Sequence, residues 1–329
     1  MQSNIVTLHQ ITKPILEDII IYQKEFEQAL SSEVRLIDSI AKYLIKNKGK
    51  GIRPILTILS SRLCGEPTIN SYRSAAMIEL LHIATLIHDD VVDDATLRRG
   101  KPSINKVWKN KLSVLMGDFI LSKALINMIG LKDFDALEQI SKTAEKLSAG
   151  EILQIEKSIT RTMTEDIYFD MINQKTAALF ATACELGAIT TTKKQKDRKA
   201  MYVFGECLGM AFQIKDDLFD LLGKEHETGK NGGGDVKKNM ATLPLIFSKN
   251  NMPRSAKWEL NILLGKKNKN GRVMSKICDI IENTGGFKYS EKKLDEYSNQ
   301  AISELNIYPD SPVKQSMIDL VSFNIHRIN

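Results

Sequence analysis

The sequence lacks several features that mark common protein classes. Its only four cysteines, at positions 64, 184, 207 and 278, form no CxxC pair. This spacing argues against a disulfide framework or a zinc site and favours buried thiols in a reducing compartment. Met1–Lys13 holds no apolar core of a signal peptide, and the longer apolar stretches are interrupted by Asp, Glu, Lys or Asn. We therefore expect a soluble, cytoplasmic protein with at most peripheral membrane contact.

Aromatic residues, charge of one sign and strand patterns are also scarce. Aromatics make up 6% of the chain, and 46 basic against 40 acidic residues leave a net charge of +6. The basic residues are scattered, so we expect no nucleic-acid partner, whereas an anionic small substrate fits. Alternating apolar runs joined by Asn-Gly turns do not occur, apart from Asn270-Gly271 in a lysine-rich segment that we interpret as a loop.

Helical periodicity fills most of the chain instead. Apolar residues recur at three- and four-residue spacing over Ile52–Leu63, Ala75–Asp90, Leu112–Ile129, Ala136–Glu156, Asp166–Gly187 and Arg198–Leu222. The breaks between these segments are short and contain no long Ser, Gly or Pro linker. We therefore predict an all-α protein with one domain over residues 1–329, a single large helical bundle.

An aspartate-rich motif occurs twice, near the end of two predicted helices. The first copy holds Asp89, Asp90 and Asp93, and the second holds Asp216, Asp217 and Asp220. Within each copy, carboxylates four residues apart share a helix face and repel by a few tenths of a kcal/mol. A single motif of this kind is often only a solvated helix end. Two copies embedded in apolar sequence favour magnesium, which binds one or two carboxylates together with substrate phosphates.

The regions around both motifs resemble the trans-prenyl diphosphate synthases, and their long-chain polyprenyl branch in particular. The first region is Leu86–Asp93 followed by Leu97–Gly100, and the second is Phe212–Asp220. Shorter matching motifs are Gly117-Asp118-Phe119, Gly150-Glu151 with Gln154, Lys175-Thr176-Ala177, Thr242-Leu243-Pro244 and Gly285-Gly286. The resemblance runs from about Lys50 to Arg327. It implies a helical bundle of the isoprenoid synthase type around a central cavity, and a homodimer.

Basic residues would hold the diphosphates. The segment Lys48–Pro54 precedes a predicted helix, whose N-terminus favours anions, although it also fits an ordinary basic loop. The resemblance assigns Lys50, Arg53, His82 and Arg99 to isopentenyl diphosphate, and Arg98, Lys175, Thr176, Gln213 and Lys230 to the allylic diphosphate or its ions. Taken alone, His82 is more typical of a helical core, and Lys175 could extend from an apolar helix to the surface.

The resemblance implies magnesium-dependent chain elongation. Asp89, Asp93 and Asp216, with Lys175, would be catalytic, and all six aspartates of the two motifs would bind about three Mg²⁺ ions. An allylic diphosphate would ionise and then be attacked by isopentenyl diphosphate. One expected lysine is missing: the position two residues before Thr242 is Met240, with Lys237 and Lys238 just upstream. Either a neighbour replaces that lysine, or the phosphate clamp is incomplete.

Product length depends on the helix turn before Asp89. Ala84 and Thr85 lie about one turn back, with Leu81 deeper, and one turn rises about 5.4 Å, close to one isoprene unit. Ala84 and Thr85 are small, so the growing chain should pass them. We therefore expect an all-trans product above about twenty carbons, in the range of about thirty to forty. Small residues are also ordinary in packed helices, which leaves a short-chain synthase of the farnesyl or geranylgeranyl type as an alternative.

Three other classes fit less well. A terpene cyclase normally has Asn, Ser and Glu in its second metal motif, whereas aspartates recur here. A metal phosphohydrolase suggested by His88-Asp89 would need further ligating histidines, which the sequence does not supply in that pattern. A non-catalytic partner subunit of a synthase is the rival of another class. Such subunits tend to have lost one aspartate-rich motif, whereas both motifs are present.

Overall fold

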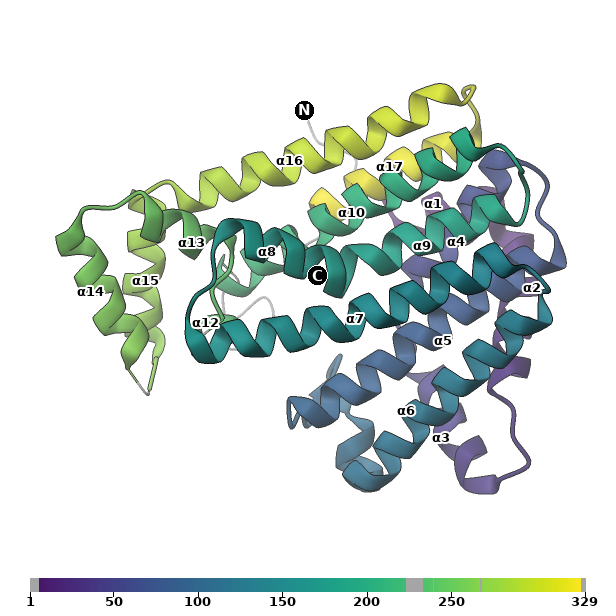
Figure 1. Cartoon of the computed structure of the whole chain (residues 1–329), viewed down its shortest axis with the longest axis horizontal. Coiled ribbons are helices and arrows are strands. Elements are labelled where there is room, and N and C mark those ends of the chain that lie inside the picture. Colours follow the sequence, from purple (N-terminus) through teal and green to yellow (C-terminus); the bar gives the residue numbers. More distant parts are fainter. Residues whose placement is uncertain (1–5, 223–232, 239, 267, 327–329) are drawn as a thin grey trace.

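The computed structural model describes residues 6–222, 233–238, 240–266 and 268–326, and helices dominate this part of the chain (Figure 1). The N-terminal half contains α1 (Leu8–Thr12), η1 (Lys13–Ile15), α2 (Leu16–Leu30), α3 (Arg35–Lys46), α4 (Ile52–Cys64), α5 (Ile69–Val92), β1 (Leu97–Arg98), β2 (Lys101–Pro102), α6 (Ile104–Gly130) and α7 (Phe134–Thr160). The C-terminal half contains α8 (Glu165–Ile172), η2 (Asn173–Ala177), α9 (Ala178–Ile189), α10 (Gln195–Leu222), α12 (Gly234–Lys237), α13 (Leu243–Asn250), α14 (Arg254–Gly265), α15 (Gly271–Asn283), α16 (Gly286–Glu304), η3 (Leu305–Ile307) and α17 (Pro312–His326).

All six helices predicted from periodicity are present. Five correspond to α4, α5, α6, α7 and α10, but α5 begins at Ile69 instead of Ala75, and α6 begins at Ile104 instead of Leu112. Helix α6 is also kinked at Lys109, which has φ +70°. The sixth, Asp166–Gly187, is divided into α8 and α9 by η2, a π-helical turn. The expected break at Gly100–Pro102 contains a two-residue antiparallel hairpin, in which Leu97 pairs with Pro102 and Arg98 with Lys101.

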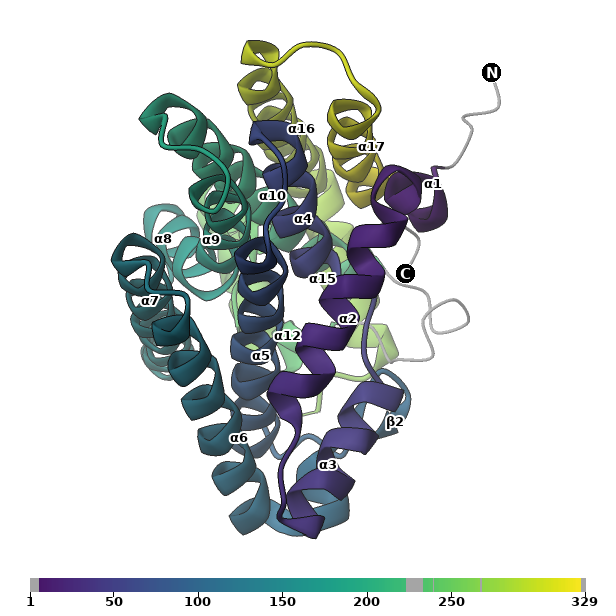
Figure 2. The ribbon, with the colours of Figure 1, turned by 90° about the vertical axis from the view of Figure 1, so that its right-hand side faces the viewer.

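Helix α5 lies in the middle of the bundle. It packs against α2, α4, α6, α7 and α9, and Figure 2 shows it surrounded by these neighbours. A capping box begins this helix: the Thr68 side chain accepts from the backbone of Ser71, whose hydroxyl accepts from the Thr68 amide at 3.0 Å. The first aspartate motif is thus carried by the C-terminal end of a helix that is fixed on most sides.

The apolar core consists of two clusters. One gathers buried residues of α2, α4, α5, α6, α9 and the first half of α10, and the other joins α8, the second half of α10, and α13 to α16. Helix α10 contributes to both, with Leu208 in the first cluster and Met210 in the second. The second aspartate motif therefore lies on a helix that is anchored in both clusters.

Two left-handed backbone turns position the basic residues. Gly51 has φ +64° immediately before α4, a conformation that favours glycine. Arg99 (φ +51°) and Gly100 (φ +73°) are the central residues of the β1–β2 hairpin. Two successive positive φ values are typical of a type I′ turn, whose twist matches that of paired strands. The turn directs Arg98 and Arg99 back toward α5.

Helix α6 has an unusual apolar surface. Its exposed side chains include Leu115, Ile126 and Ile129, at 56%, 65% and 62% exposure. Among the described helices, it alone is long and apolar enough to cross a membrane by length and composition, and 33% of that apolar window is buried. Asp118, Lys123 and Asn127 interrupt this stretch, so the sequence predicted no membrane span here. Buried core helices pass the same test, but much of this apolar surface is left exposed by the residues that the structure describes.

Candidate active site

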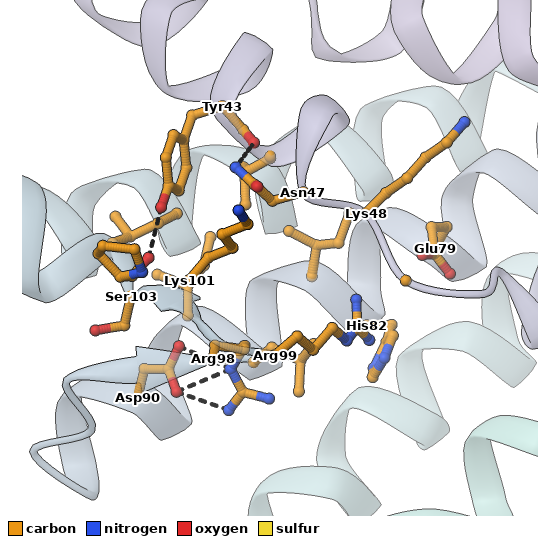
Figure 3. A pocket seen from close by; sticks show the side chains of 17 residues that line it. Tyr43, Asn47, Lys48, Glu79, His82, Asp90, Arg98, Arg99, Lys101 and Ser103 are labelled. Atoms are coloured by element: carbon orange, nitrogen blue, oxygen red, sulfur yellow. Dashed lines mark hydrogen bonds and ion pairs between the residues drawn. The ribbon is translucent and has the colours of Figure 1, made fainter. Parts of the chain in front are cut away.

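The first aspartate motif divides its three carboxylates among different partners. Asp90 is buried, and both of its oxygens accept hydrogen bonds from Arg98 Nε at 2.8 and 2.9 Å. Arg98 Nη2 adds a third contact at 2.7 Å, and Figure 3 shows this side chain turned toward Asp90. Asp93, at the end of α5, accepts from Lys238 Nζ at 2.9 Å. Asp90 thus fixes the hairpin, while Asp93 is paired across the site.

Asp89, the first carboxylate of the motif, is partly buried. Burial and the nearby Glu151 raise its pKa to about 6, against the opposing effect of Lys175 and Arg98. The folded protein therefore disfavours the charged form of Asp89, mainly because burial removes water from the carboxylate. Such a site gains free energy when a further cation binds.

The second aspartate motif shows the same division. Asp217 is buried and accepts from the Tyr168 hydroxyl at 2.7 Å and from Gln213 Nε2 at 2.8 Å. The Gln213 carbonyl oxygen accepts from the Thr176 hydroxyl at 2.7 Å, which links α10 to η2. Burial, followed by the charge of Asp235, raises the pKa of Asp217 to about 8.

Asp220 and Asp235 extend the acidic cluster beyond the second motif. The Asp220 carboxylate accepts from the backbone amides of Gly234 and Asp235, both at 3.0 Å, and so holds the start of α12. Burial, Asp220 and Asp216 all act to raise the pKa of Asp235, which reaches about 6. Asp216, Asp220 and Asp235 are thus close enough to interact, although Asp235 lies outside both motifs.

A π-helical turn presents Lys175 to the carboxylates. Lys175 Nζ donates to Gln154 Oε1 at 3.0 Å and forms an ion pair with Glu151, both on α7. A π-turn inside a helical stretch shifts the following residues around the axis and is frequent at functional sites. Lys175 therefore points toward α7 and the site, so the alternative that it only extends to the surface is not what the structure shows.

One cavity collects residues from both halves of the site. It has a volume of about 180 Å³. Its lining includes Asp93, Gln154, Lys175, Thr176, Gln213, Asp217, Asp235, Lys238 and Met240. We call it the carboxylate cavity. Five of the residues predicted from the sequence meet here, and Lys238 occupies the region where the expected lysine is replaced by Met240.

The remaining basic residues line a second, larger cavity of about 320 Å³, which we call the basic cavity. Its polar lining includes Lys50, Arg53, His82 and Arg99, with Glu79 among them. A smaller cavity of about 70 Å³ adjoins it and shares Glu79, His82 and Arg99. Figure 3 shows the Arg99 side chain extending toward His82. All four residues predicted to hold isopentenyl diphosphate are therefore together.

Arg53 is partly buried next to His82, with its Nη1 atom 3.0 Å from His82 Nε2. The guanidinium also lies 4.6 Å above the ring of Phe180. Burial lowers the pKa of Arg53 to about 10, and burial together with the neighbouring arginines lowers the pKa of His82 well below its usual value. A neutral His82 accepts from Arg53 through Nε2 and keeps its proton on Nδ1.

Glu79, Asp235 and Glu151 were not identified as site residues from the sequence. Burial raises the pKa of Glu79, while Arg53, Arg99 and Lys48 lower it, so this acid balances the basic cavity. An acid within the apolar run 77–81 was the available signal for it, because acids are rarely buried unless paired.

The other predicted residues are placed as follows. Ala84 and Leu81 are buried in α5, and the hydroxyl of the partly exposed Thr85 donates to the His82 carbonyl at 2.9 Å. None of these three lines the cavities described above. Lys230 lies outside the described residues. No three Asp, Glu, His or Cys side chains within the described ranges are grouped closely enough to hold a metal ion by themselves.

Comparisons with known proteins identify the family. The family model "Polyprenyl synthetase" matches residues 34–281. An all-trans-nonaprenyl-diphosphate synthase (geranyl-diphosphate specific) of Rhodobacter capsulatus is 34% identical, with 97% of each chain covered. The octaprenyl diphosphate synthase of Escherichia coli is 32% identical over 98% of this chain and 99% of its own.

Solved structures give the same result. A polyprenyl synthase from Caulobacter crescentus, complexed with calcium and isoprenyl diphosphate, superposes with a TM-score of 0.91 at 29% identity, covering 99% of each chain. The all-α bundle of the isoprenoid synthase type is confirmed, and the enzyme class predicted from the sequence, a prenyltransferase, is that of the family. The chain belongs to the polyprenyl synthetase family.

Proposed function

We propose that this protein is a long-chain all-trans polyprenyl diphosphate synthase that extends an allylic diphosphate with isopentenyl diphosphate. The observation that carries the proposal is the pairing of two cavities. One is lined by carboxylates of both aspartate motifs and the other by Lys50, Arg53, His82 and Arg99. The charge of Asp216, in the second aspartate motif, acts on Arg53 of the basic cavity, which supports placing a metal-bound and a cation-bound diphosphate near each other.

Magnesium fits the donors of the carboxylate cavity, which are oxygen atoms of aspartates and amides. Burial, with nearby carboxylates, raises the pKa of Asp89 and of Asp235, so a bound cation would stabilise the charged forms of both acids. Asp89, Asp93, Asp216 and Asp220 are the residues we assign to about three Mg²⁺ ions, in line with the few carboxylates that Mg²⁺ uses beside phosphates. Bound Mg²⁺ would neutralise the leaving diphosphate.

Asp90 and Asp217 are assigned a positioning role and no metal-binding role in this proposal. Their carboxylates are engaged by Arg98 and by Tyr168 and Gln213, respectively. They would orient the adjacent Asp89 and Asp216 and hold Arg98 and Gln213 in place. Direct metal binding by Asp90 and Asp217, as the sequence predicted, stays a prediction.

The protein's own residues then perform the remaining steps. Lys175, Lys238 and Arg98 stabilise negative charge on the departing diphosphate, at the point where that charge develops. Lys50, Arg53 and Arg99 hold isopentenyl diphosphate so that its double bond faces the allylic carbon, which gives the benefit of proximity. The apolar walls provided by Phe180 and Phe212 exclude water from the cation. A proton is finally lost from the new chain, with the departed diphosphate as acceptor.

We further propose a homodimer, a single domain over residues 1–329 and a cytoplasmic location. The exposed apolar face of α6 is suited to a second copy of the chain. Helices α10 and α16 contribute to both core clusters, which supports one domain. All four cysteines are free thiols, as expected in a reducing compartment.

Condensation by the purified protein tests the proposal. Wild-type protein with Mg²⁺, an allylic diphosphate and isopentenyl diphosphate is expected to form products above about twenty carbons. Asp89→Asn and Asp216→Asn should each lower turnover by about 10²-fold or more, since charge stabilisation is lost. Asp310→Asn is the control, because that carboxylate is fully exposed and pairs only with Lys314.

Three outcomes of the condensation assay would contradict the proposed function. Full turnover by Asp89→Asn at unchanged Mg²⁺ dependence would contradict the assigned site. Products of about twenty carbons or fewer would indicate a short-chain synthase. Absence of condensation by the protein alone, with activity restored by another subunit, would indicate a partner subunit.

A further inference from the structure

A third cavity, of about 330 Å³, lies on the other side of one wall of the carboxylate cavity. The two cavities share Lys157, Met163, Met240 and Ala241. The rest of its lining comes from Arg161 after α7, from Val236 of α12, and from α13 and α14. None of the residues predicted to bind substrate or metal lines it.

Four basic side chains line this third cavity: Lys157, Arg161, Lys249 and Lys257. No acidic residue is among its described lining residues. Lys157 has a partner, Glu156, at 2.6 Å. For Arg161, Lys249 and Lys257, the described part of the chain provides no carboxylate within ion-pair distance. Three cations therefore line a common space, and no carboxylate of the described residues pairs with any of them.

The cations influence one another. Burial lowers the pKa of Lys249, and the charges of Lys257 and Arg161 lower it further. Arg161 also acts on Lys269, a buried lysine, in the same direction. Arg161 ends α7 in a left-handed conformation, with φ +57°, which is uncommon for a residue with a side chain. Arg161 and Lys257 are exposed and Lys249 is partly buried, so repulsion and desolvation act mainly on Lys249, and a bound anion would offset them there.

The rest of the lining is apolar, with two amides at the rim. Val236, Leu245 and Ile246 are buried, and Leu264 and Met240 add further apolar surface. Asn250 and Asn261 are the amides. An arginine fork with lysines around it suits a multiply charged oxyanion. The apolar surface beside it suits a short hydrocarbon stem.

We propose that the third cavity is a second phosphate-binding site, separate from the carboxylate and basic cavities, which takes the phosphate or diphosphate group of a prenyl phosphate or of the free inorganic ion. Met240 belongs to the wall between this site and the carboxylate cavity. Lys157 lines both cavities and is paired with Glu156, so Arg161, Lys249 and Lys257 are the cations that line this site and not the carboxylate cavity.

Calorimetric titration tests this proposal. The wild-type protein in EDTA is titrated with inorganic diphosphate and, separately, with geranyl phosphate, so that metal-dependent binding in the carboxylate cavity is suppressed. Lys249→Gln/Lys257→Gln removes two cations of the site. Lys196→Gln/Lys199→Gln is the matched control, because both lysines are exposed at the start of α10 and have no ion-pair partner in the described ranges.

We expect the Lys249/Lys257 variant to bind at least one of the two probes at least tenfold more weakly than the wild type, and the control to bind like the wild type. Tighter binding of geranyl phosphate than of diphosphate identifies a lipid phosphate as the ligand, and the reverse order identifies the free ion. Equal affinities of the wild type and the Lys249/Lys257 variant for both probes would overturn the proposal.

The variant is also expected to fold. Removing mutually repelling cations should leave the thermal midpoint unchanged or raise it. If the double variant fails to fold, Lys257→Gln alone, at an exposed position, provides the same comparison. Binding is measured without turnover, so a failure of the proposed condensation activity and a failure of this site are distinguishable.

Discussion

Glu185, on α9, is a carboxylate with incomplete compensation outside the reaction cavities. Its Oε2 atom is buried without a hydrogen-bond partner within the described structure. The nearby Arg198 is engaged by Asp135 at 2.8 Å. Burial raises the pKa of Glu185 to about 7, and the attraction of Arg198 only partly opposes this effect. The charged form is therefore the unfavourable form in the folded protein.

This pKa gives a prediction about stability and pH. Between about pH 4.5 and 7, folded Glu185 keeps a proton that the unfolded chain releases, so stability falls as pH rises through this window. Glu185→Gln should raise the free energy of unfolding at pH 8 by about 1 to 2 kcal/mol, discounted for partial exposure, and give little gain at pH 4.5. Urea denaturation at both pH values measures this.

The control for this experiment is Glu138→Gln, at an exposed carboxylate that pairs with Lys142. It should leave the pH dependence of stability unchanged. A gain from Glu185→Gln that is equal at pH 4.5 and pH 8 would show that the titration of Glu185 is not its cause.

At the scale of single residues, the sequence predicted which residues belong to the site better than it predicted the role of each one. Adjacent residues such as Asp89 and Asp90 lie about 100° apart around a helix. Which of them faces a cavity is decided by the packing of α5, and the motif itself does not contain that information. Asp235 was missed for a related reason. Its contact with Asp220 depends on how the chain returns to α10 after residues that no periodicity constrains.

At the scale of elements, the packing of α7 against η2 sets the place of Lys175. Gly150 on α7 is buried, and a Cβ atom there would be 2.7 Å from the Lys175 backbone nitrogen. Backbone cannot move aside as a flexible side chain does. The close approach of the two elements therefore requires glycine at this position.

Gly150→Ala is accordingly expected to displace η2 and to lower both stability and turnover. Overpacking of this kind costs about 1 to 3 kcal/mol. Gly130→Ala is a matched control at the end of α6, where a Cβ atom would meet nothing within 4 Å. Thermal melts and condensation assays of both variants test the prediction. A Gly150→Ala protein with normal turnover would show that Lys175 is not positioned by this contact.

Helix α5 carries the prediction on product length. Leu81, Thr85 and Asp89 are spaced four residues apart and so follow one stripe of the helix. Ala84→Phe and Thr85→Phe should shorten the product to about fifteen or twenty carbons, because a ring would occupy the turn beneath Asp89. Ala84 is buried, so its substitution should also cost about 1 to 3 kcal/mol.

Chromatography of the dephosphorylated products measures this effect. Thr85→Ser, which keeps the small size and the hydroxyl, is the control and should leave the product distribution unchanged. Unaltered product lengths from a folded, active Thr85→Phe enzyme would show that the growing chain does not pass this turn.

The elements themselves were largely predictable, with one informative exception. Apolar residues at helical spacing determine α4 to α7 and α10 because each buries one face. The same periodicity runs through Asp166–Gly187, yet the structure contains the π-turn η2 there. A π-turn inserts one extra residue without breaking the apolar pattern, so the sequence has no clear mark of it. The turn is explained by tertiary packing against α7 and α10.

At the scale of the whole molecule, the exposed apolar face of α6 remains to be accounted for. Leu115, Ser122, Ile126 and Ile129 are exposed and lie on one stripe of the helix. The opposite side of α6 packs on α5 through buried residues such as Met116 and Ile120. A helix that is apolar on both sides is expected to be buried on both sides. The periodicity of apolar residues in the sequence does not indicate which side of α6 stays exposed in the described structure.

This face leads to the prediction on assembly. A stable dimer interface buries about 800 Å² per partner, and charges in its centre are strongly unfavourable. The wild type should therefore sediment as a dimer at micromolar concentration, and Leu115→Glu/Ile126→Glu should sediment as a monomer. Trp258→Glu, at a large exposed side chain on α14, is the matched control and should remain dimeric.

The sedimentation experiment also separates a protein partner from a lipid surface. If α6 contacts a second copy, the glutamate variant becomes monomeric, and the wild type shows no more affinity for lipid vesicles than the variant does. A wild-type monomer that binds vesicles, with binding lost in the variant, would instead show that the face meets a membrane. A variant that remains dimeric would place the interface elsewhere.

Helix α6 contacts His88, one residue before Asp89, so dimer formation through α6 would also affect the active site. Dimer formation would then hold α6 against the end of α5 that carries the first aspartate motif, so the monomeric variant should also lose turnover.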